Sequence, residues 1–300
     1  MTSGKIQNKK RLRFIINPNS GVNENKNFPY LINQYLDQEK YDHEIIYTKE
    51  ANHATTLAKE ASSLGVDAVV AVGGDGTINE VGSTLIGSDV ILGIIPCGSG
   101  NGFARNLKIP MNIKKAIKLI NEFNFTSVDT AKINDRFFLA IAGIGFDAHI
   151  ANEFAKSKKR GFFTYAKHVM KEYPKYLPKS FEMIIDGEKI IREGFLFSFA
   201  KSSQYGNNIK IAPNAKMDDG YIHVSILKKP PVKNYLDVLW KLSFGSIIKS
   251  KYYETIKCKN IKIPQKGLTA HIDGESVFFD NDIEISIIPK SIKILINLTK

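Results

Sequence analysis

Cysteine is scarce in this sequence, and its scarcity excludes two classes of protein. The 300 residues include two cysteines, Cys97 and Cys258, which lie far apart and lack the spacing of metal ligands. Two such residues build neither a disulfide framework nor a zinc site, so we expect both to be reduced thiols. The histidines form no H-x-x-x-H pair, and we assign none of them to a metal.

Long apolar runs are missing as well. No stretch of about 18 apolar residues occurs, so no segment predicts a transmembrane helix. The first residues, MTSGKIQNKKRLR, are polar and basic and lack the apolar core of a secretory signal. We therefore expect a cytoplasmic protein. Internal repeats and low-complexity segments are also missing, and the hydrophobic content of 43% is typical of a globular chain.

Acidic residues are outnumbered by basic ones. The chain has 42 Lys and Arg against 30 Asp and Glu, which gives a net charge of +12. Such a surplus favours an anionic partner: nucleic acid, an acidic membrane face or a phosphate-rich ligand. Charge alone does not choose among the three.

Apolar strands alternate with helices up to about residue 126. Strands that are apolar throughout and separated by helices indicate a parallel sheet covered on both faces. We therefore predict a doubly wound α/β domain over residues 1–126. The expected strands are 13–17, 43–48, 67–72 and 90–96, and the expected helices are 28–38, 51–65, 77–87 and 113–123.

The pattern changes after Thr126 and becomes mostly β. Helical stretches around 149–175 and 233–249 interrupt the strands. Such a change predicts a second domain over residues 127–289, built from antiparallel strands with a few helices. From its own residues, the last strand, 290–300, fits either domain.

A glycine-rich loop follows the most apolar strand, in VVAVGGDGTINEVG (69–82). Gly73, Gly74 and Gly76 allow a ligand to approach the backbone, and the following helix directs its positive end to the same point. Thr77 adds a hydroxyl donor, whereas Asp75 would need Mg²⁺ between itself and a phosphate. The alternative is a tight strand-to-helix turn. Neither G-x-x-x-x-G-K-[ST] nor G-x-G-x-x-G is present.

A second loop of this kind follows the next strand, in IIPCGSGNGFARNL (94–107). It contains Gly98, Gly100 and Gly102, with Ser99 and Asn101 as donors. Two glycine-rich turns on consecutive strands place two amide-lined concavities side by side, and one nucleotide can span both.

Six motifs together resemble the bacterial soluble diacylglycerol kinases, which are relatives of the sphingosine and ceramide kinases and, more distantly, of the NAD kinases. GGDGT alone is shared with NAD kinases, so the full set is the more specific signal. The resemblance implies ATP-dependent phosphorylation of a lipid hydroxyl in a cleft between an NAD kinase-like α/β domain and a lipid-binding β-sandwich domain, with strand 290–300 returning to the first domain. The motifs are NPNSG (17–21), GGDGTINEV (73–81), PCGSGNGFAR (96–105), GIGFDA (143–148), DDGY (218–221) and HIDGE (271–275).

The resemblance also implies which residues bind ATP and Mg²⁺. In KMDDGY it places a structural Mg²⁺ on the Asp219 side chain and the carbonyls of Lys216 and Tyr221, while Asp75 and Asp129 supply carboxylates to a water and Mg²⁺ network. The alternative for KMDDGY is an ordinary hairpin turn. The implied ATP-site residues are Asn17, Thr48, Gly73, Gly74, Asp75, Gly76, Thr77, Ile78, Asn79, Glu80, Gly98 and Ser99.

Asp273 in HIDGE is the general base that the resemblance implies, with Glu275 beside it. A second Asp-Gly turn is the competing explanation. One departure concerns the acceptor: many members have aspartate directly after the asparagine of the second loop, where this chain has Gly102. Diacylglycerol, which would give phosphatidic acid in phospholipid biosynthesis, is our first choice, and a sphingoid base or ceramide is the alternative.

Two segments mix lysines with aromatic residues, 156–179 and 240–253. A solvated helix or nucleic-acid binding would also produce such a mixture, but beside the kinase motifs we expect docking to the anionic inner face of the membrane, where each lysine contributes about 1 kcal/mol. We expect no nucleic acid as partner, and a homodimer stays open. The rival functions are an NAD kinase and a non-catalytic nucleotide- or nucleic-acid-binding protein.

Overall fold

The computed structural model describes residues 9–20, 27–157 and 161–297. Gly21 of the NPNSG motif, three basic residues at 158–160 and the last residues of strand 290–300 lie outside these ranges. The chain divides into two compact units. The first comprises Met1–Gly98, Leu107–Thr126 and Ile292–Lys300, and the second comprises Ser99–Asn106 and Ser127–Ser291.

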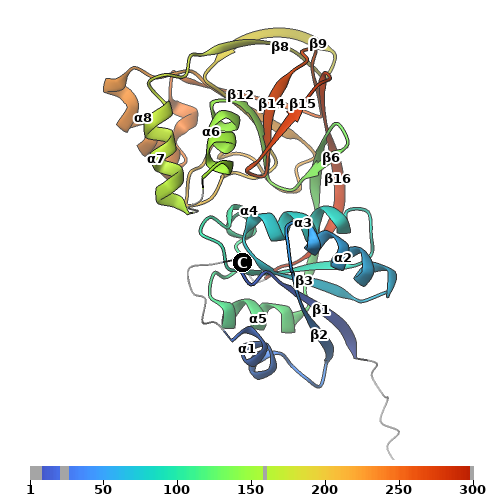
Figure 1. Cartoon of the computed structure of the whole chain (residues 1–300). Helices are drawn as coiled ribbons and strands as arrows, with labels where there is room; N and C mark the ends of the chain where they lie inside the picture. Colours follow the sequence, from blue (N-terminus) through green and yellow to red (C-terminus); the bar gives the residue numbers. More distant parts are fainter. Residues whose placement is uncertain (1–8, 21–26, 158–160, 298–300) are drawn as a thin grey trace, which may run out of the picture. The chain divides into compact units, whose positions relative to one another are not determined.

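The first unit contains the predicted parallel sheet. Its strands lie in the order β2-β1-β3-β4, and each neighbouring pair is parallel (Figure 1). Every residue of β3 and β4 is buried, which explains why these strands are apolar throughout. The bounds are β1 Lys10–Ile16, β2 Tyr41–Tyr47, β3 Ala68–Gly73 and β4 Ile91–Pro96.

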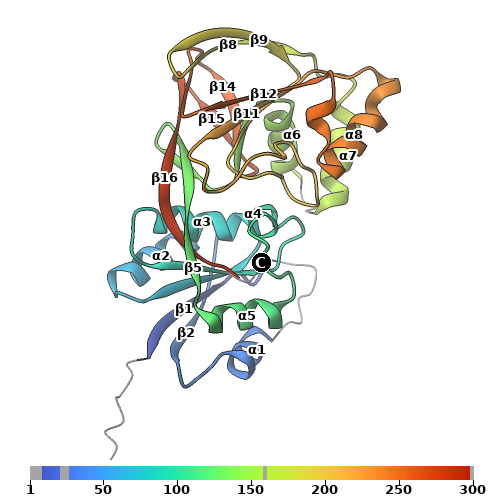
Figure 2. The same ribbon diagram turned by 180° about the vertical axis from the view of Figure 1, so that it is seen from behind.

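Helices cover both faces of this sheet, with α2 and α3 on one face and α1 and α5 on the other (Figures 1 and 2). In α5 the buried residues Ile113, Ala116, Ile117 and Ile120 recur every three or four positions, and Asn112 caps its N-terminus by accepting from the Lys115 amide. An amphipathic helix of this kind buries one stripe and leaves the other face exposed. The bounds are α1 Phe28–Tyr35, α2 His53–Ser63, α3 Asp75–Leu85 and α5 Ile113–Glu122.

The last strand, β16 (Ile283–Leu295), crosses the boundary between the units: its residues up to Ser291 belong to the second unit and those from Ile292 onward to the first. Its early residues pair antiparallel with β13 (Asn260–Ile263), and Ile294 pairs parallel with Leu92 of β4. It continues through Pro289 and through Lys290, whose φ is 47°. The expected strand 290–300 is thus the end of a longer strand.

One boundary differs from the predicted one. Residues Ser99–Asn106, expected in the first domain, belong to the second unit and include the short helix α4 (Gly102–Asn106). The Asn106 side chain accepts hydrogen bonds from the amide and hydroxyl of Ser203. Asn101 forms an isolated bridge with Gly206. These local contacts tie the second glycine loop to the second unit.

The second unit is a sandwich of antiparallel sheets. One sheet has the order β12-β11-β10-β7-β14-β15, and the other contains β16-β13-β8-β9 with β5 and β6. Phe181 of β8 and Phe197 of β10 meet edge to face at 5.0 Å between ring centroids, inside a core that both sheets share. The bounds are β5 Phe125–Ile133, β6 Arg136–Phe138, β7 Ile141–Gly145, β8 Lys179–Ile185, β9 Glu188–Gly194, β10 Leu196–Ala200, β11 Ile222–Leu227, β12 Tyr253–Cys258, β14 Leu268–Ile272 and β15 Glu275–Phe279.

The six-stranded sheet is buried on its other face as well. Phe197 and Phe199 face the sandwich core, while Leu196 and Ala200 of the same strand face a second apolar cluster that includes helix residues. The helices beside this sheet are α6, α7 and α8 (Figure 2). Their bounds are α6 Phe146–Ala155, α7 Phe162–Glu172 and α8 Tyr235–Phe244, preceded by a 3₁₀ turn at Val232–Asn234 and followed by another at Ile247–Lys249. Among the described residues, no helix combines the length and apolar character that crossing a bilayer requires.

Cys258 is fully buried at the end of β12, and both cysteines are free thiols. Burial raises the pKa of the Cys258 thiol to about 12, and the nearby Asp186 charge acts in the same direction. Because the thiolate is the reactive form, this thiol should be inert while the protein is folded.

We therefore expect a thiol reagent at mildly alkaline pH to titrate Cys97 and to reach Cys258 only after unfolding. In a Cys97→Ser variant the native protein should show no fast-reacting thiol, and denaturant should release one. Rapid labelling of native Cys97→Ser would contradict the burial of Cys258.

Candidate active site

The two glycine-rich loops begin at the ends of adjacent strands in the first unit. Gly73 at the end of β3 pairs in parallel register with Pro96 at the end of β4. The Cys97 amide donates to the Gly73 carbonyl at 2.7 Å. A Cβ placed on Gly74 would lie 3.3 Å from the Cα of Gly98, so the two backbones approach closely. Glycine at position 74 permits this approach.

Helix α3 starts directly in the first loop. Its N-cap is Gly74, which offers no side-chain hydrogen bond, and its first helical residue is Asp75. The amides of the first turn have no partner within a helix, and the positive end of the helix dipole lies at the same place. A Cβ on Gly73 would come within 2.5 Å of the Thr77 side chain, so this position also requires glycine.

Asn17, Thr48 and Thr77 lie at the same edge of the sheet. Asn17 Nδ2 donates to Thr77 Oγ1 at 3.1 Å, and the Asn17 amide donates to the Val72 carbonyl. Thr48 follows β2, and its amide donates to the Ile16 carbonyl at 2.8 Å. Because Thr77 accepts from Asn17, its own hydroxyl proton is oriented away from that amide. The structure brings these predicted residues together with Gly73 and Gly74.

Other predicted ATP-site residues use their side chains elsewhere. Ile78 is buried in the core of the first unit. Glu80 accepts from the Ala54 amide at 3.1 Å and thereby caps the start of α2. Asn79 accepts from the Ser83 hydroxyl one turn further along the helix. The motif residues 78–80 therefore serve the packing of α3 with their side chains.

The second loop has no room for the acidic residue that many family members carry. A Cβ on Gly102 would lie 2.4 Å from the Tyr205 carbonyl oxygen. Arg105 Nε donates to the Gly100 carbonyl at 2.9 Å and holds the loop from its other side. Ser99 is exposed. Glycine at position 102 is thus required by the local backbone of the second unit.

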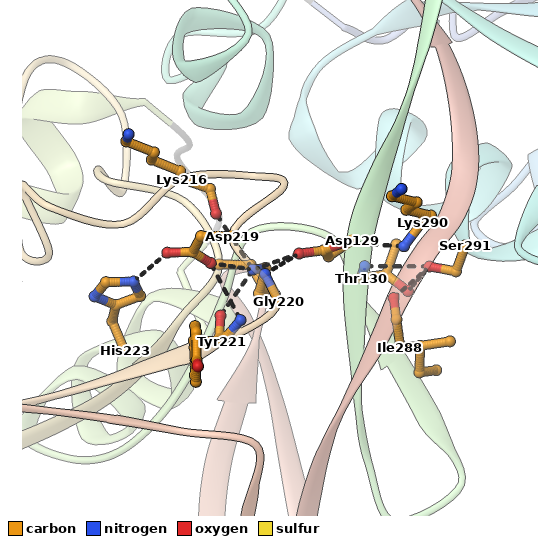
Figure 3. Close-up of polar contacts among 11 residues, drawn as sticks. Asp129, Thr130, Lys216, Asp219, Gly220, Tyr221, His223, Ile288, Lys290 and Ser291 are labelled. Carbon is orange, nitrogen blue, oxygen red and sulfur yellow. Dashed lines mark hydrogen bonds and ion pairs between the residues drawn. The ribbon is translucent and has the colours of Figure 1, made fainter.

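The KMDDGY turn, where a structural Mg²⁺ was predicted, surrounds the ammonium of Lys201. Lys201 Nζ donates to Asp129 Oδ2 at 3.2 Å, Asp219 Oδ1 at 3.1 Å, the Lys216 carbonyl at 3.3 Å and the Tyr221 carbonyl at 2.7 Å. Figure 3 shows Asp129, Asp219 and the Lys216 carbonyl directed toward one region. Lys201 was not among the predicted site residues, and its only sequence signal is a lysine directly after the apolar strand FLFSFA.

The predicted Mg²⁺ does not fit this site. Lys201 Nζ occupies the position between these oxygens, so a Mg²⁺ bound by the same oxygens would lie next to the ammonium charge. The three predicted ligands, Asp219, Lys216 and Tyr221, are present, but their shared cation is the ammonium. Within the described ranges, no cluster of three or more His, Cys, Asp or Glu side chains is arranged to hold a metal. The cation that the structure places between these predicted ligands is therefore the Lys201 ammonium.

Asp129 and Asp219 are fixed by further hydrogen bonds. Asp129 also accepts from the amides of Gly220 and Lys290 at 2.8 and 2.9 Å, and Asp219 accepts from His223 Nε2 at 2.7 Å. Burial acts most strongly on Asp219 and raises its pKa, but the hydrogen bonds from His223 and Lys201 and the Lys201 charge leave the pKa below its ordinary value. Burial lowers the pKa of His223 more than Asp219 raises it, so the imidazole is neutral at neutral pH.

Asp273 occupies the first position of a two-residue hairpin loop between β14 and β15. Ile272 pairs with Glu275, and Asp273 and Gly274 both have positive φ, 46° and 91°. The Asp273 carboxylate accepts from three consecutive backbone amides, those of residues 139–141, at 2.8–2.9 Å. Charge-assisted bonds of this kind stabilise the carboxylate as an anion. Glu275 is exposed at the start of β15.

The β8–β9 hairpin contains a second aspartate in nearly the same arrangement. Ile185 pairs with Glu188, and Asp186 and Gly187 have φ values of 48° and 93°. The Asp186 carboxylate accepts from the amides of Lys259 and Asn260. An Asp-Gly turn that binds amides thus occurs twice in this unit, and this geometry by itself does not identify a base.

A buried polar network distinguishes the HIDGE turn from its twin. His271 Nε2 lies 3.0 Å from Asp147 Oδ2, and the Tyr205 hydroxyl donates to the same oxygen at 2.9 Å. Burial, and then the Asp147 charge, raises the pKa of Tyr205 well above its ordinary value, so the phenol keeps its proton. A Cβ on Gly143 would lie 2.3 Å from Asp147 Oδ2. The motifs GIGFDA and HIDGE are therefore parts of one hydrogen-bonded cluster.

Two family models match this chain. Residues 11–133 match the model of the diacylglycerol kinase catalytic domain, and residues 140–296 match that of the YegS C-terminal NAD kinase beta sandwich-like domain. The chain is 31% identical over 272 residues to a diacylglycerol kinase of Bacillus subtilis, covering 89% of this chain and 90% of that protein. It is 28% identical over 255 residues to a diacylglycerol kinase of Mycobacterium tuberculosis, covering 82% of each chain.

A solved structure shows the same fold. The crystal structure of a diacylglycerol kinase from Bacillus anthracis superimposes with a TM-score of 0.72 over 97% of both chains, at 23% identity. At this identity the likeness concerns the fold, and it confirms the predicted fold class of a parallel α/β domain and an antiparallel sandwich domain. Both halves of the chain match their family models in the expected order, and the chain therefore belongs to the diacylglycerol kinase family of lipid kinases.

Proposed function

We propose that the protein transfers the γ-phosphoryl group of ATP to the hydroxyl of a membrane lipid, with diacylglycerol as the first-choice acceptor and phosphatidic acid as the product. The observation that carries this proposal is the meeting of two glycine-rich loops at the ends of β3 and β4, directly before helix α3. Backbone amides at such a place bind phosphate oxygens without a lysine, which agrees with the missing P-loop motif.

The first unit supplies groups that fit a nucleotide. The first-turn amides of α3 would bind phosphate oxygens, and the Thr77 hydroxyl, oriented by Asn17, would donate to another. The Mg²⁺ that accompanies ATP would supply positive charge to the phosphates, and Asp75 in the first turn of α3 is the carboxylate placed to bind it, directly or through water. Most of the catalysis in phosphoryl transfer is positioning and charge neutralisation of this kind.

Asp273 is the proposed general base. Its three amide bonds fix the direction of the carboxylate. A loose transition state requires little proton removal before the phosphoryl group has moved, so the orientation of the carboxylate matters more than its basicity. The role proposed for Asp273 is therefore to orient the acceptor hydroxyl and to accept its proton late. Glu275 is the neighbouring carboxylate on β15.

Glycine at position 102 affects which lipid we expect as the phosphoryl acceptor. The family's carboxylate cannot be restored there without moving the Tyr205 backbone, so the chain lacks one of the acids that many diacylglycerol kinases use. The curated relatives named diacylglycerol kinase keep diacylglycerol as the first choice. A sphingoid base or ceramide is the second candidate, since related lipid kinases also lack an acid at this position.

Exposed apolar residues on α8 support docking to a membrane surface. Leu236, Trp240 and Phe244 recur every four residues and are 77%, 64% and 63% exposed. Residues at this spacing lie on one face of a helix, and Lys233 and Lys249 are exposed at its two ends. An exposed apolar stripe between lysines is typical of a helix that lies in a lipid interface.

Helix α7 adds a second stripe of the same kind. Phe163 and Met170, one heptad apart, are exposed, and Lys167 and Lys171 lie between and beside them. Tyr173, just after α7, contacts Tyr235 at the start of α8, with 4.8 Å between ring centroids. The two helices lie side by side in both views (Figures 1 and 2). We propose that they dock on the inner face of the membrane, where the lipid acceptor lies.

Thr77→Val should weaken ATP binding by about tenfold, because it removes one hydroxyl donor worth roughly 1.5 kcal/mol to a charged phosphate. Thr84→Val is the matched control, since Thr84 lies on the same helix and its hydroxyl donates to the Glu80 carbonyl. Calorimetric titration of the nucleotide checks both variants. Equal affinity of Thr77→Val and wild type would exclude Thr77 from the phosphate site.

Asp273→Asn should lower phosphoryl transfer to lipid by about 10²-fold or more, the usual contribution of a positioned base. The measurement is the transfer of labelled γ-phosphate to a panel of diacylglycerol, sphingoid base and ceramide, which also identifies the acceptor. The free energy of unfolding of the variant must be measured as well, so that a loss of activity is not confused with a loss of folding.

Asp186→Asn is the control for that experiment, because it disturbs the twin turn. Both variants should lose about 1–3 kcal/mol of stability through unsatisfied amides, since an amide nitrogen replaces a carboxylate oxygen. Only Asp273→Asn should lose turnover. If both variants turn over lipid like wild type, Asp273 is a turn residue and the base lies elsewhere. Labelling of no lipid by wild type would exclude the lipid kinase activity.

Replacing Trp240 and Phe244 together by serine should weaken binding to vesicles that contain phosphatidylglycerol by about tenfold or more, because each ring is worth roughly 1.5–3 kcal/mol when buried. Cosedimentation measures this, and turnover of a short-chain soluble diacylglycerol should stay unchanged. Ile191→Ser is the control, since Ile191 is 61% exposed on β9. An equal loss in Ile191→Ser, or no loss in the double variant, would place the lipid-facing surface elsewhere.

A further inference from the structure

We infer that Lys201 acts as a built-in, covalently attached cation that replaces a divalent metal ion in the KMDDGY turn, so that this turn is held together without any metal. The inference concerns the stability and metal independence of the second unit. It stands apart from the proposed phosphoryl transfer, and its test uses neither nucleotide nor lipid.

The composition of the site is the first argument. The oxygens around Lys201 Nζ come from two carboxylates, Asp129 and Asp219, and two carbonyls, those of Lys216 and Tyr221. Hard oxygen ligands with two negative charges are a donor set that suits a divalent cation. Four oxygens also exceed the three hydrogens of an ammonium, so at least one hydrogen is shared. These four oxygens therefore surround a single positively charged group, the Lys201 ammonium.

The burial of the ammonium is the second argument. Lys201 is fully buried, and Asp129 and Asp219 are 2% and 14% exposed. A buried charge is costly unless it is paired and hydrogen-bonded, and here every contact of the ammonium compensates that cost. A metal ion entering this space would meet the ammonium charge, so Lys201 excludes it.

The elements that Lys201 joins are the third argument. Lys201 follows β10, Asp129 belongs to β5, and Asp219 lies in the turn before β11. Asp129 accepts from the Lys290 amide of β16, and the neighbouring Thr130 amide donates to the Ser291 hydroxyl (Figure 3). One ammonium therefore anchors strands from both sheets of the sandwich, which is the structural role of a bound metal.

His223 is buried beside Asp219 and binds its second carboxylate oxygen. Its Nε2 lies 2.7 Å from Asp219 Oδ2, the oxygen that does not bind Lys201. A neutral imidazole donates here and adds no second charge. Asp219 Oδ1 accepts from Lys201 Nζ and from the Tyr221 amide, and Oδ2 accepts from His223. This fixed arrangement directs Oδ1 at the ammonium.

The wild-type protein gives the first test. Without nucleotide, its thermal unfolding should be the same in Mg²⁺ and in a chelator, and Mn²⁺ added as a paramagnetic probe should show no enhanced water-proton relaxation from a site that needs Asp219. A divalent ion that stabilises the wild type, with the effect lost in Asp219→Asn, would overturn the inference.

Lys201→Ala gives the second test, because it removes the ammonium and leaves the oxygens. The variant should unfold at a lower temperature in chelator, and Mg²⁺ or Mn²⁺ should restore stability in a concentration-dependent way, as ligand binding to the folded state requires. The added change Asp219→Asn should abolish the restoration. A destabilised variant that binds no divalent ion, or one as stable as wild type in chelator, would each overturn the inference.

Lys229→Ala is the matched control. Lys229 Nζ donates to the carbonyls of Pro174 and Tyr176 and has no carboxylate among these contacts. Its removal should not create a divalent-ion site. If Lys201→Ala fails to fold in chelator, the variant should fold when it is expressed and refolded in Mg²⁺. If it folds under neither condition, the comparison of wild-type unfolding in Mg²⁺ and in chelator decides for or against the inference.

Discussion

Negative charge bound by backbone amides is the interaction on which this structure depends. In the second unit the carboxylates of Asp129, Asp186 and Asp273 each accept from two or more backbone amides that join separate segments of the chain. In the first unit the amides at the start of α3 carry the positive end of a helix dipole. The same backbone chemistry thus fixes the sandwich with internal anions and, in the proposed function, lets the first glycine-rich loop bind an external one. A lysine in the loop is unnecessary because the backbone supplies the positive potential.

Internal anions need counter-charges, and the chain supplies one in Lys201. Two buried carboxylates without a cation would repel each other and pay the full cost of desolvation. A metal ion would solve this problem reversibly, at the expense of depending on the metal supply. The lysine ammonium neutralises these carboxylates permanently, because it is part of the chain. Its three hydrogens, however, fit four oxygens less well than a metal ion would. The net charge of +12 leaves many lysines at the surface, whereas Lys201, directly after a buried strand, is fully buried.

The fold could be predicted from periodicity, because β3 and β4 are buried at every residue and α5 is amphipathic. The motifs also located Asn17, Gly73, Gly74 and Thr77, which meet at one sheet edge because parallel strands end there. The identity of the cation could not be predicted: Lys201 is distant in sequence from Asp129 and close to Asp219 only in the fold. The stretch TIKCKNIKI (255–263) likewise has no local break, yet the chain divides at Lys259 into β12 and β13, which enter different sheets. A local sequence pattern depends on neighbours along the chain. The position of Lys201 and the division between β12 and β13 depend on residues that are neighbours only in the folded structure.

The two Asp-Gly hairpins share one structural role, and for Asp273 we propose a second, catalytic one. Asp186 and Asp273 have the same backbone conformation and the same kind of amide partners, so the turn is stable for reasons that have nothing to do with chemistry. What differs is the surroundings. Asp186 is exposed in a plain hairpin, whereas Asp273 is half-buried and follows His271, whose imidazole is bound by Asp147. A carboxylate whose direction is already fixed by its own turn loses little entropy when it must orient a hydroxyl, which is the condition that positioning catalysis requires. The amide bonds hold Asp273 in one direction, and in the proposed phosphoryl transfer, with late proton removal, this fixed direction matters more than the basicity of the carboxylate.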